Sequence, residues 1–387
     1  KYSGTIVAMN SITTFDLFVP GRVCLFGEHS DWAGGYRRIN SQIEKGYAII
    51  TGINQGIHAK VSSHPDTLIY RGEREGKVLE YKVPMLEDKL LDQAKRGEYF
   101  SYIAGVAYQI LTHYHVGGLV IENYKTDLPI QKGLSSSAAI SVLTARGFNR
   151  VYDLKMTVRG EMDLAYRGEI TTPSRCGRMD QGCAYGIRPI LMTFDGDAID
   201  VEEIALKEDL YMVLVDLNAK KDTKRILRDL NKAFPFADNE TEAEVQRYLG
   251  KTNRDLVMKA KEVMESQGPE KIGELMVEAQ RLFDDALVPA CPEELMAPVL
   301  HTMLQNETTK ALHYGGKGVG SQGDGTAQLV VKDAECQDRL VRLFKEEFSM
   351  DALPVVLRKT RKLRKAVITA AGLGTRLFPM TKVLRKE

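Results

Sequence analysis

The pattern of apolar positions in the first half of the chain predicts a mixture of strands and helices. Short apolar runs, rich in β-branched and aromatic residues, predict strands at 15–19, 46–50 and 118–121. From Ser137 to about Tyr152 the apolar residues recur at close to helical spacing, so this segment is predicted to be a helix.

A different pattern begins in the second half of the chain. Residues 210–216 predict a strand, and two apolar stripes predict two long helices: Leu256, Ala260, Val263 and Met264 form the first stripe, and Leu275, Ala279, Leu282 and Phe283 form the second. We interpret both stripes as core packing. A glycine-dense loop is expected at 315–325, followed by a strand at 327–331. The change of pattern predicts a domain boundary near residue 205.

The composition narrows the class of protein. The chain has 387 residues, of which 43% are hydrophobic and 27% charged, as in soluble globular proteins of about two domains. Lys and Arg number 53 against 52 Asp and Glu, so no overall field favours nucleic acid or an anionic membrane, and neither is an expected partner. The five scattered cysteines predict neither a disulfide framework nor a zinc site. We expect a cytoplasmic enzyme.

The strongest local signal is Gly133-Leu134-Ser135-Ser136-Ser137-Ala138, between a predicted strand and a predicted helix. Small residues let the backbone wrap closely around a ligand, and a helix start offers unpaired N–H groups and the positive end of the helix dipole, which together bind phosphate. The alternative interpretation is that Ser135 or Ser136 only caps the helix. A Walker-type phosphate loop is excluded, because no G-x-x-x-x-G-K-[ST] pattern occurs.

A second signal is the turn at 27–35, where Glu28, His29 and Asp31 precede two glycines. Carboxylate and imidazole groups close together can bind the hydroxyl groups of a sugar. Zinc does not suit this spacing, which lacks a second histidine. A polar surface turn remains the structural alternative.

A third signal is the segment 176–182, in which Asp180 follows closely after Glu169. One carboxylate could orient a hydroxyl group while the other holds a metal ion. Solvated surface charges are the alternative. A formal G-x-G-x-x-G at 318–323 leads into a strand rather than a helix, so a Rossmann site is excluded, and a loop over phosphates or substrate is expected instead.

Taken together and in their order along the chain, the segments 20–35, 133–138 and 176–181 resemble motifs of the GHMP kinase superfamily, and most closely those of its galactokinases. The resemblance covers about residues 15–355. The segment 20–35 resembles the family's P-G-R-V-N-L-x-G-E-H-T-D-Y-x-G-G motif, residues 133–138 its G-L-S-S-S-A motif and residues 176–181 its C-G-x-M-D-Q motif. The resemblance implies an α+β, two-domain fold: an N-terminal α/β domain over 1–205 and a C-terminal ferredoxin-like domain over 206–357.

The resemblance also implies roles for individual residues. Those expected to cradle the ATP phosphates are Gly133, Leu134, Ser135, Ser136, Ser137 and Ala138. Ser137 and Glu169 would hold Mg²⁺. Asp180 would orient or deprotonate the sugar hydroxyl, and Arg22 would stabilise the charge around it. Glu28, His29 and Asp31 would bind sugar hydroxyls.

Two segments depart from the galactokinase pattern. Tyr36-Arg37-Arg38 follows the first motif where an apolar segment with proline is usual, and the glycine-rich segment 317–325 is not the family's usual one. Both departures put galactose in doubt as the substrate. Arg37 and Arg38 could suit an acidic sugar, or they could be two solvated charges.

A basic linker and a short tail follow, at 358–387. The tail resembles the first strand and loop of the sugar-1-phosphate nucleotidyltransferases, particularly the uridylyltransferases. The resemblance implies that UTP or another nucleoside triphosphate binds there; the residues concerned are Gly372, Gly374, Thr375, Arg376 and Lys386.

The sequence therefore predicts an ATP- and Mg²⁺-dependent sugar kinase that phosphorylates the anomeric hydroxyl of a monosaccharide, within a kinase and nucleotidyltransferase that makes a nucleotide sugar. One alternative is a GHMP kinase for a non-sugar alcohol. The other is a catalytically dead sugar-sensing regulator.

Overall fold

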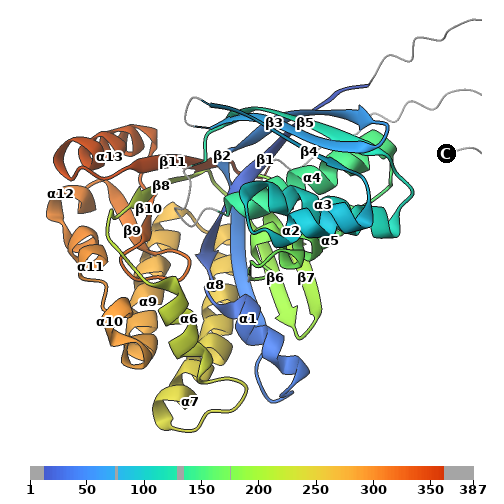
Figure 1. Cartoon of the computed structure of the whole chain (residues 1–387). Coiled ribbons are helices and arrows are strands. Elements are labelled where there is room, and N and C mark those ends of the chain that lie inside the picture. The colour runs from blue at the N-terminus through green and yellow to red at the C-terminus, as the bar shows by residue number, and fades with distance from the viewer. Residues whose placement is uncertain (1–12, 75–76, 129–134, 175, 361–387) are drawn as a thin grey trace, which may run out of the picture.

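Two β-sheets organise the chain in the computed structural model, which describes residues 13–74, 77–128, 135–174 and 176–360 (Figure 1). The strands of the first sheet are β1 (Phe15–Phe26), β2 (Gly46–His64), β3 (Thr67–Arg74), β4 (Lys77–Pro84), β5 (Gly118–Thr126), β6 (Ile190–Asp195) and β7 (Ala198–Glu203). Their order is β4-β3-β5-β2-β6-β7, with β1 paired to β2.

The long strand β2 holds this sheet together. It pairs antiparallel with β1, with β5 through its later residues and with β6 through its first five residues. The register of β1 against β2 shifts between Pro20 and Arg22 and again between Cys24 and Phe26. Such irregularities change where side chains point, and Arg22 lies directly after the first one.

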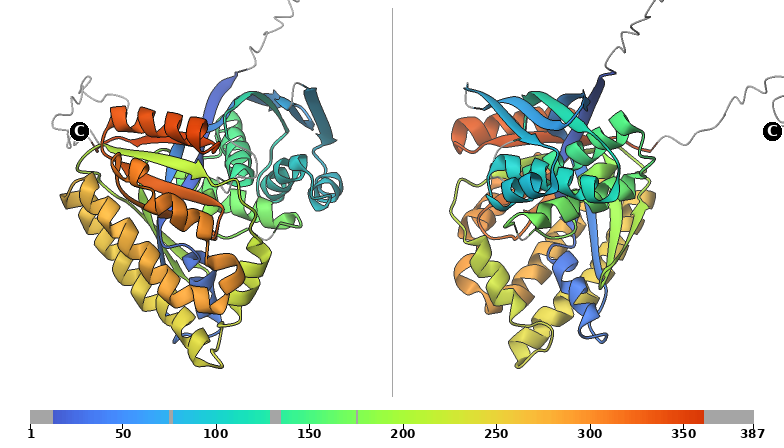
Figure 2. Two further views of the ribbon diagram at one scale, coloured as in Figure 1. Left: turned by 90° about the vertical axis from the view of Figure 1, so that its left-hand side faces the viewer. Right: turned by 45° about the vertical axis from the view of Figure 1, so that its right-hand side comes forward.

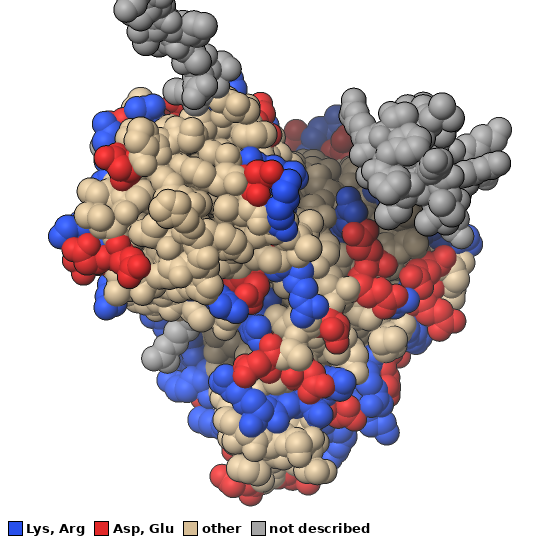
Figure 3. All heavy atoms as spheres, turned by 90° about the vertical axis from the view of Figure 1, so that its right-hand side faces the viewer, with Lys and Arg blue, Asp and Glu red and all other residues tan. Residues whose placement is uncertain are grey.

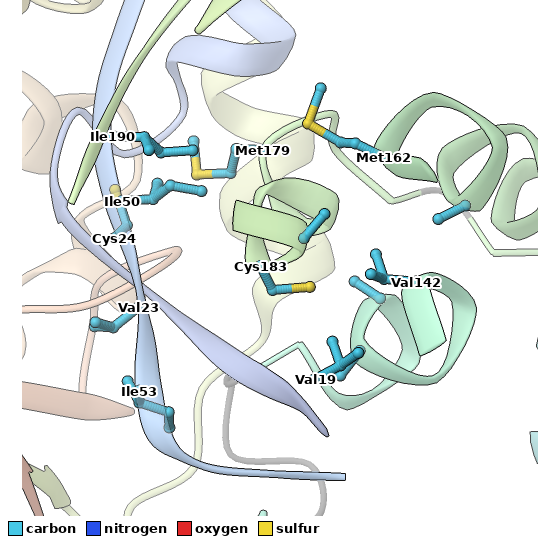
Figure 4. Packing of buried hydrophobic residues seen from close by; sticks show 14 of the residues in the cluster. Val19, Val23, Cys24, Ile50, Ile53, Val142, Met162, Met179, Cys183 and Ile190 are labelled. Atoms are coloured by element: carbon cyan, nitrogen blue, oxygen red, sulfur yellow. The ribbon is translucent and has the colours of Figure 1, made fainter. Parts of the chain in front are cut away.

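Helices cover one face of the first sheet. They are α2 (Glu87–Lys95), α3 (Tyr99–His113), α4 (Ser136–Tyr152) and α5 (Val158–Thr171), while α1 (Ser30–Gly35), the 3-10 turn η1 (Tyr36–Arg38) and the 3-10 turn η2 (Asp180–Tyr185) lie nearer the strand ends. The core between them is apolar. Met179 packs near Ile50 and Ile190, and Cys183 of η2 lies toward Val142 of α4 (Figure 4). This packing fixes the segment that carries Asp180.

The second sheet is antiparallel and consists of β8 (Leu210–Asp216), β9 (His313–Gly318), β10 (Thr326–Val331) and β11 (Ala352–Leu357), in the order β11-β8-β10-β9. The long helices α8 (Asn253–Ser266) and α9 (Pro269–Leu287) run side by side, and α13 (Ala334–Glu347) packs on β8 and β11 (Figure 2). The resulting β-α-β-β-α-β order is that of a ferredoxin-like domain.

Shorter helices complete this half of the described chain. They are α6 (Thr223–Asn231), α7 (Glu240–Arg247), α10 (Pro292–Leu295), α11 (Pro298–Gln305) and α12 (Glu307–Lys310), with the π-helical turn η3 (Tyr248–Thr252) and the 3-10 turn η4 (Val288–Ala290). No helix in the described part of the chain is long and apolar enough to cross a membrane.

The α+β prediction is confirmed, and each strand and helix predicted within residues 13–360 exists, most with longer bounds, whereas the strand predicted in the tail lies outside the described residues. The two predicted stripes lie in α8 and α9 and are buried except for the partly buried Leu282. The predicted glycine loop at 315–325 was wrong in its first part, because residues up to Gly318 belong to β9 and pair with β10. Glycine composition suggested a loop, whereas close packing explains these glycines: a Cβ at Gly315 would lie 2.2 Å from the carbonyl oxygen of Gly273 in α9.

The surface carries both signs of charge. On the face shown in Figure 3, Lys and Arg are mixed with Asp and Glu over the lower part, and a broad uncharged area at the upper left is bordered by side chains of both signs. This mixture agrees with the balanced composition and gives no single-sign field.

A buried glutamine connects the two sheets. Gln328 of β10 is fully buried, and its Nε2 donates a hydrogen bond of 2.9 Å to the carbonyl oxygen of Cys24 in β1. The contact lies two residues from Arg22 on β1, so it sets the position of the second sheet relative to the site described below.

We predict that Gln328→Ala lowers the free energy of unfolding by about 1–3 kcal/mol, because a buried carbonyl loses its donor. Chemical denaturation measures this. Gln42→Ala, at an exposed glutamine, is the matched control and should change stability by less than about 0.5 kcal/mol. Equal effects of the two variants would contradict the proposed role of Gln328.

Candidate active site

An ion pair between Arg22 and Asp180 lies at the centre of the candidate site. Arg22 Nη2 donates to Asp180 Oδ1, joining β1 to the first residue of η2. The Arg22 side chain is 7% exposed, whereas the Asp180 side chain is 23% exposed. Asp180 is therefore within reach of a ligand, and the buried guanidinium keeps a positive charge beside it.

Glu169 lies next to this pair. It is fully buried near the end of α5, and its Oε2 accepts a hydrogen bond of 2.7 Å from Gln181 Nε2, one residue after Asp180. Burial raises its pKa, although the Ser137 hydroxyl and Gln181 act to lower it. Glu169 Oε1 has no hydrogen-bond partner among the described residues.

This pair of oxygen donors fits Mg²⁺. Mg²⁺ is commonly held by one or two carboxylates together with substrate phosphates. The unpartnered oxygen of Glu169 and the nearby hydroxyl of Ser137 supply ligands of that kind from α5 and α4.

The start of α4 is consistent with anion binding rather than with a serine cap. Ser135 precedes the helix with a left-handed φ of 56°, and its side chain makes no capping hydrogen bond. The first N–H groups of α4 are thus left for another acceptor. Ser135, Ser136, Ser137 and Ala138 are described, whereas Gly133 and Leu134 lie outside the described residues.

Glu28 is paired with a residue of the second sheet. The Lys317 ammonium of β9 donates to Glu28 Oε1, and the two side chains are 2% and 6% exposed. Lys317 Nζ also donates to the carbonyl oxygen of Gly318 at 3.0 Å. This buried ion pair joins the first predicted motif to the C-terminal half of the chain.

His29 and Asp31 flank the start of α1. His29 has a left-handed φ of 67°, and its Nδ1 accepts a hydrogen bond of 3.1 Å from Trp32 Nε1. Burial lowers the pKa of His29 to about 4, so the ring is neutral near pH 7. Burial raises the pKa of Asp31, although the backbone N–H groups of Trp32 and Met179 and the charge of Arg22 act to lower it.

The loops of the first and third motifs pack directly on each other. A Cβ at Gly177 would lie 1.8 Å from Asp31 Oδ2, so glycine is required at that position for Asp31 to approach the segment that carries Asp180. The structure thus brings together Arg22 and Asp180, Glu169 and Ser137, and Asp31 and the segment that carries Asp180. Glu28 and His29 lie in the same turn as Asp31, where their own contacts are with Lys317 and Trp32.

Arg37 and Arg38 do not contribute to this group. Arg37 Nε donates to Asp195 at 2.6 Å and Nη1 to the carbonyl oxygen of Ser41 at 3.2 Å, so its guanidinium fastens η1 to the end of β6. The Arg38 side chain is 64% exposed and lies 3.5 Å from Asp197. Structural and surface ion pairs account for both residues, and the acidic-sugar interpretation of this pair finds no support.

Sequence reasoning missed two residues of the site. Gln181 was seen only as part of a motif, and Lys317 only as one position of a glycine-dense segment. No sequence signal distinguished Lys317, because a lysine beside glycines is also typical of a solvated loop. The tail residues Gly372, Gly374, Thr375, Arg376 and Lys386 lie outside the described residues.

Comparison with known proteins finds relatives along most of the chain. The model of the GHMP kinases N terminal domain matches residues 101–186, which include Ser137, Glu169 and Asp180. The galactokinase of Thermococcus kodakarensis is 27% identical over 334 residues, covering 80% of this chain and 86% of that protein. The galactokinase of Pyrococcus furiosus is 24% identical over 375 residues, covering 88% and 96%.

Solved structures show the same fold at low identity. Lactococcus lactis galactokinase complexed with galactose superposes with a TM-score of 0.66 at 17% identity, covering 89% of this chain and 93% of that one. L. major mevalonate kinase in complex with R-mevalonate gives a TM-score of 0.66 at 20% identity, covering 91% and 98%.

The chain therefore has the fold of the GHMP kinases, and residues 101–186 match the N terminal domain of that family. Its sequence is similar to those of galactokinases, which are phosphotransferases with an alcohol group as acceptor.

We predict that Lys317→Met destabilises the protein by about 3–5 kcal/mol, because it leaves the Glu28 carboxylate buried without a counter-charge. The double variant Lys317→Met/Glu28→Gln should recover most of that loss, since it removes both charges. Urea denaturation of the two variants tests this. A double variant as unstable as the single one would show that the ion pair is not the cause.

Proposed function

We propose that the chain is an ATP-dependent sugar kinase that phosphorylates the anomeric hydroxyl of a monosaccharide. The observation that carries the proposal is one connected set of side chains: Ser137 approaches Glu169, Glu169 accepts from Gln181, and the adjacent Asp180 pairs with Arg22. Phosphoryl transfer needs alignment and charge neutralisation more than covalent chemistry, and this set provides both.

The roles follow from the positions. The N–H groups at the start of α4 bind the ATP phosphates, and Ser137 and Glu169 hold Mg²⁺, which neutralises phosphate charge when bound. Asp180 accepts a hydrogen bond from the acceptor hydroxyl and takes its proton as the new bond to phosphorus forms. Arg22 stabilises the negative charge that gathers there.

The sugar binds beside Asp180, at the turn that carries Glu28, His29 and Asp31. Support comes from the galactokinase relatives and from the contact of Asp31 with the segment 176–179. The fold resemblance to mevalonate kinase leaves a non-sugar alcohol as the alternative acceptor.

Phosphorylation at the anomeric oxygen is motivated by the tail. Its resemblance to sugar-1-phosphate nucleotidyltransferases suggests a second reaction that consumes a sugar 1-phosphate and a nucleoside triphosphate such as UTP. Kinase and transferase would then convert a free sugar to a nucleotide sugar.

The reaction is tested by incubating the chain with ATP, Mg²⁺ and a panel of free monosaccharides, with ¹H and ³¹P NMR of the products. We expect a phosphorus signal coupled to the anomeric proton. Phosphate only on another oxygen would contradict the anomeric assignment, and turnover of non-sugar alcohols alone would favour the alternative acceptor.

We predict that Asp180→Asn lowers kcat by about 10²- to 10⁴-fold while substrate affinity changes little, because the amide cannot take the proton. Steady-state kinetics and calorimetric titration with the sugar measure the two quantities. Asp163→Asn, on the exposed side of α5 with a 42% exposed side chain, is the matched control. If the protein were a regulator without catalytic activity, the wild-type chain would show no turnover.

A further inference from the structure

Lys221 brings an unmatched positive charge to the candidate site. It lies between β8 and α6, is half-buried, and donates from Nζ to the carbonyl oxygen of Gln322 at 2.9 Å. A Cβ at Gly325 would lie 2.4 Å from Nζ, so the glycines of the β9–β10 connection make room for this side chain. Burial lowers its pKa to about 8, which leaves it mostly protonated at pH 7.

Two carboxylates on segments near Lys221 and His29 are already engaged. Glu28 is paired with Lys317, and Glu294 Oε2 accepts a hydrogen bond of 2.8 Å from the backbone N–H of Asp222. Within the described ranges, Lys221 forms no ion pair with a carboxylate. A cation withdrawn from water normally has such a partner, so a ligand is the expected source of the missing charge.

His29 lies close to Lys221. The positive charges of Lys221 and Lys317 both act to lower the pKa of its ring, which places the ring within their electrostatic range. With Nδ1 accepting from Trp32, the neutral ring carries its proton on Nε2. His29 is 6% exposed, and its Nε2 makes no hydrogen bond of normal geometry among the described residues. The backbone carbonyl of Ser321 lies near enough to act on the ring and raise its pKa, but this neutral group supplies no negative charge.

The segment that holds Lys221 contributes a third unsatisfied group. Gln322 is 1% exposed, and neither atom of its side-chain amide has a partner in the part of the chain that the structure describes. Ser321 Oγ lies 3.2 Å from Thr223 Oγ1, which fixes this connection against the start of α6. Together with the preceding contacts, this leaves Lys221 and His29 as two hydrogen-bond donors that have no anionic acceptor among the described residues.

On the basis of the proposed function, we propose that the sugar acceptor is a uronic acid, whose carboxylate binds the Lys221 ammonium and His29 Nε2–H. A carboxylate only accepts hydrogen bonds and carries one negative charge, which matches one cation and one neutral donor. Asp31 and Asp180 then remain for the sugar hydroxyls, while Glu28 stays paired with Lys317.

The experiment compares D-glucuronate with D-glucose and D-galacturonate with D-galactose, using the full chain with ATP and Mg²⁺. We expect kcat/KM for one uronate to exceed that of its neutral counterpart by at least about 10-fold. Lys221→Met should lower kcat/KM for the uronate about 10- to 100-fold, mainly through KM, as expected for the loss of a charged hydrogen bond. The value for the neutral sugar should change less than about 3-fold.

Lys220→Met, at the exposed neighbouring lysine, is the matched control and should leave both sugars unaffected. Lys221→Arg should retain part of the uronate preference, because it keeps the charge. Thermal unfolding of each variant establishes that it is folded. Calorimetric titration of each uronate without ATP gives binding independently of turnover.

The outcomes separate this inference from the proposed function. Neutral sugars turned over with no uronate preference would overturn the uronate inference and leave the kinase standing. An equal loss for all sugars in Lys221→Met, with a raised KM for ATP, would also overturn it and assign Lys221 to the nucleotide phosphates. Uronate binding that depends on Lys221 without any phosphorylation would support the inference and contradict the kinase.

Discussion

The structure depends on a buried charge that must be matched. The Arg22 side chain extends from β1 next to an irregularity of the strand and is almost completely buried. A buried guanidinium needs an anionic partner. Asp180 is that partner. The packing of Met179 and Cys183 holds η2 in the position from which Asp180 reaches Arg22. Because Gln181 follows Asp180, the same fixed turn also holds Glu169, which Ser137 approaches from α4. One ion pair thus aligns four segments that are far apart in the sequence.

The second half of the chain completes the site by the same principle. Lys317 of β9 neutralises Glu28, and Gln328 of β10 bonds to β1, so the second sheet is held by polar contacts that are costly to break. These contacts bring the segment 319–325 and Lys221 close to His29. In our proposal, residues from both halves therefore recognise the acceptor, whereas Asp180, Glu169 and Ser137 all come from the first half.

Much of this could be predicted from the sequence, because the signals were local. The helix from 136 to 152, the strand at 210–216 and the stripes of α8 and α9 follow from the spacing of apolar residues. The three motifs could be grouped because together they resemble the motifs of the galactokinases. The burial of Lys317 and Lys221 could not be predicted. Lys317 stands beside glycines and Lys221 follows another lysine, and both patterns are typical of solvated charges. Their burial arises from contacts between segments almost 300 and about 100 residues apart, as in the bonds of Lys317 to Glu28 and of Lys221 to Gln322.

The most direct measurement is a crystal structure of the chain with Mg²⁺, a non-hydrolysable ATP analogue and an acceptor sugar. The account predicts phosphates at the start of α4, the metal ion against Ser137 and Glu169, and an acceptor hydroxyl between the terminal phosphorus and Asp180. A nucleotide bound away from α4, or a sugar hydroxyl that does not contact Asp180, would contradict it.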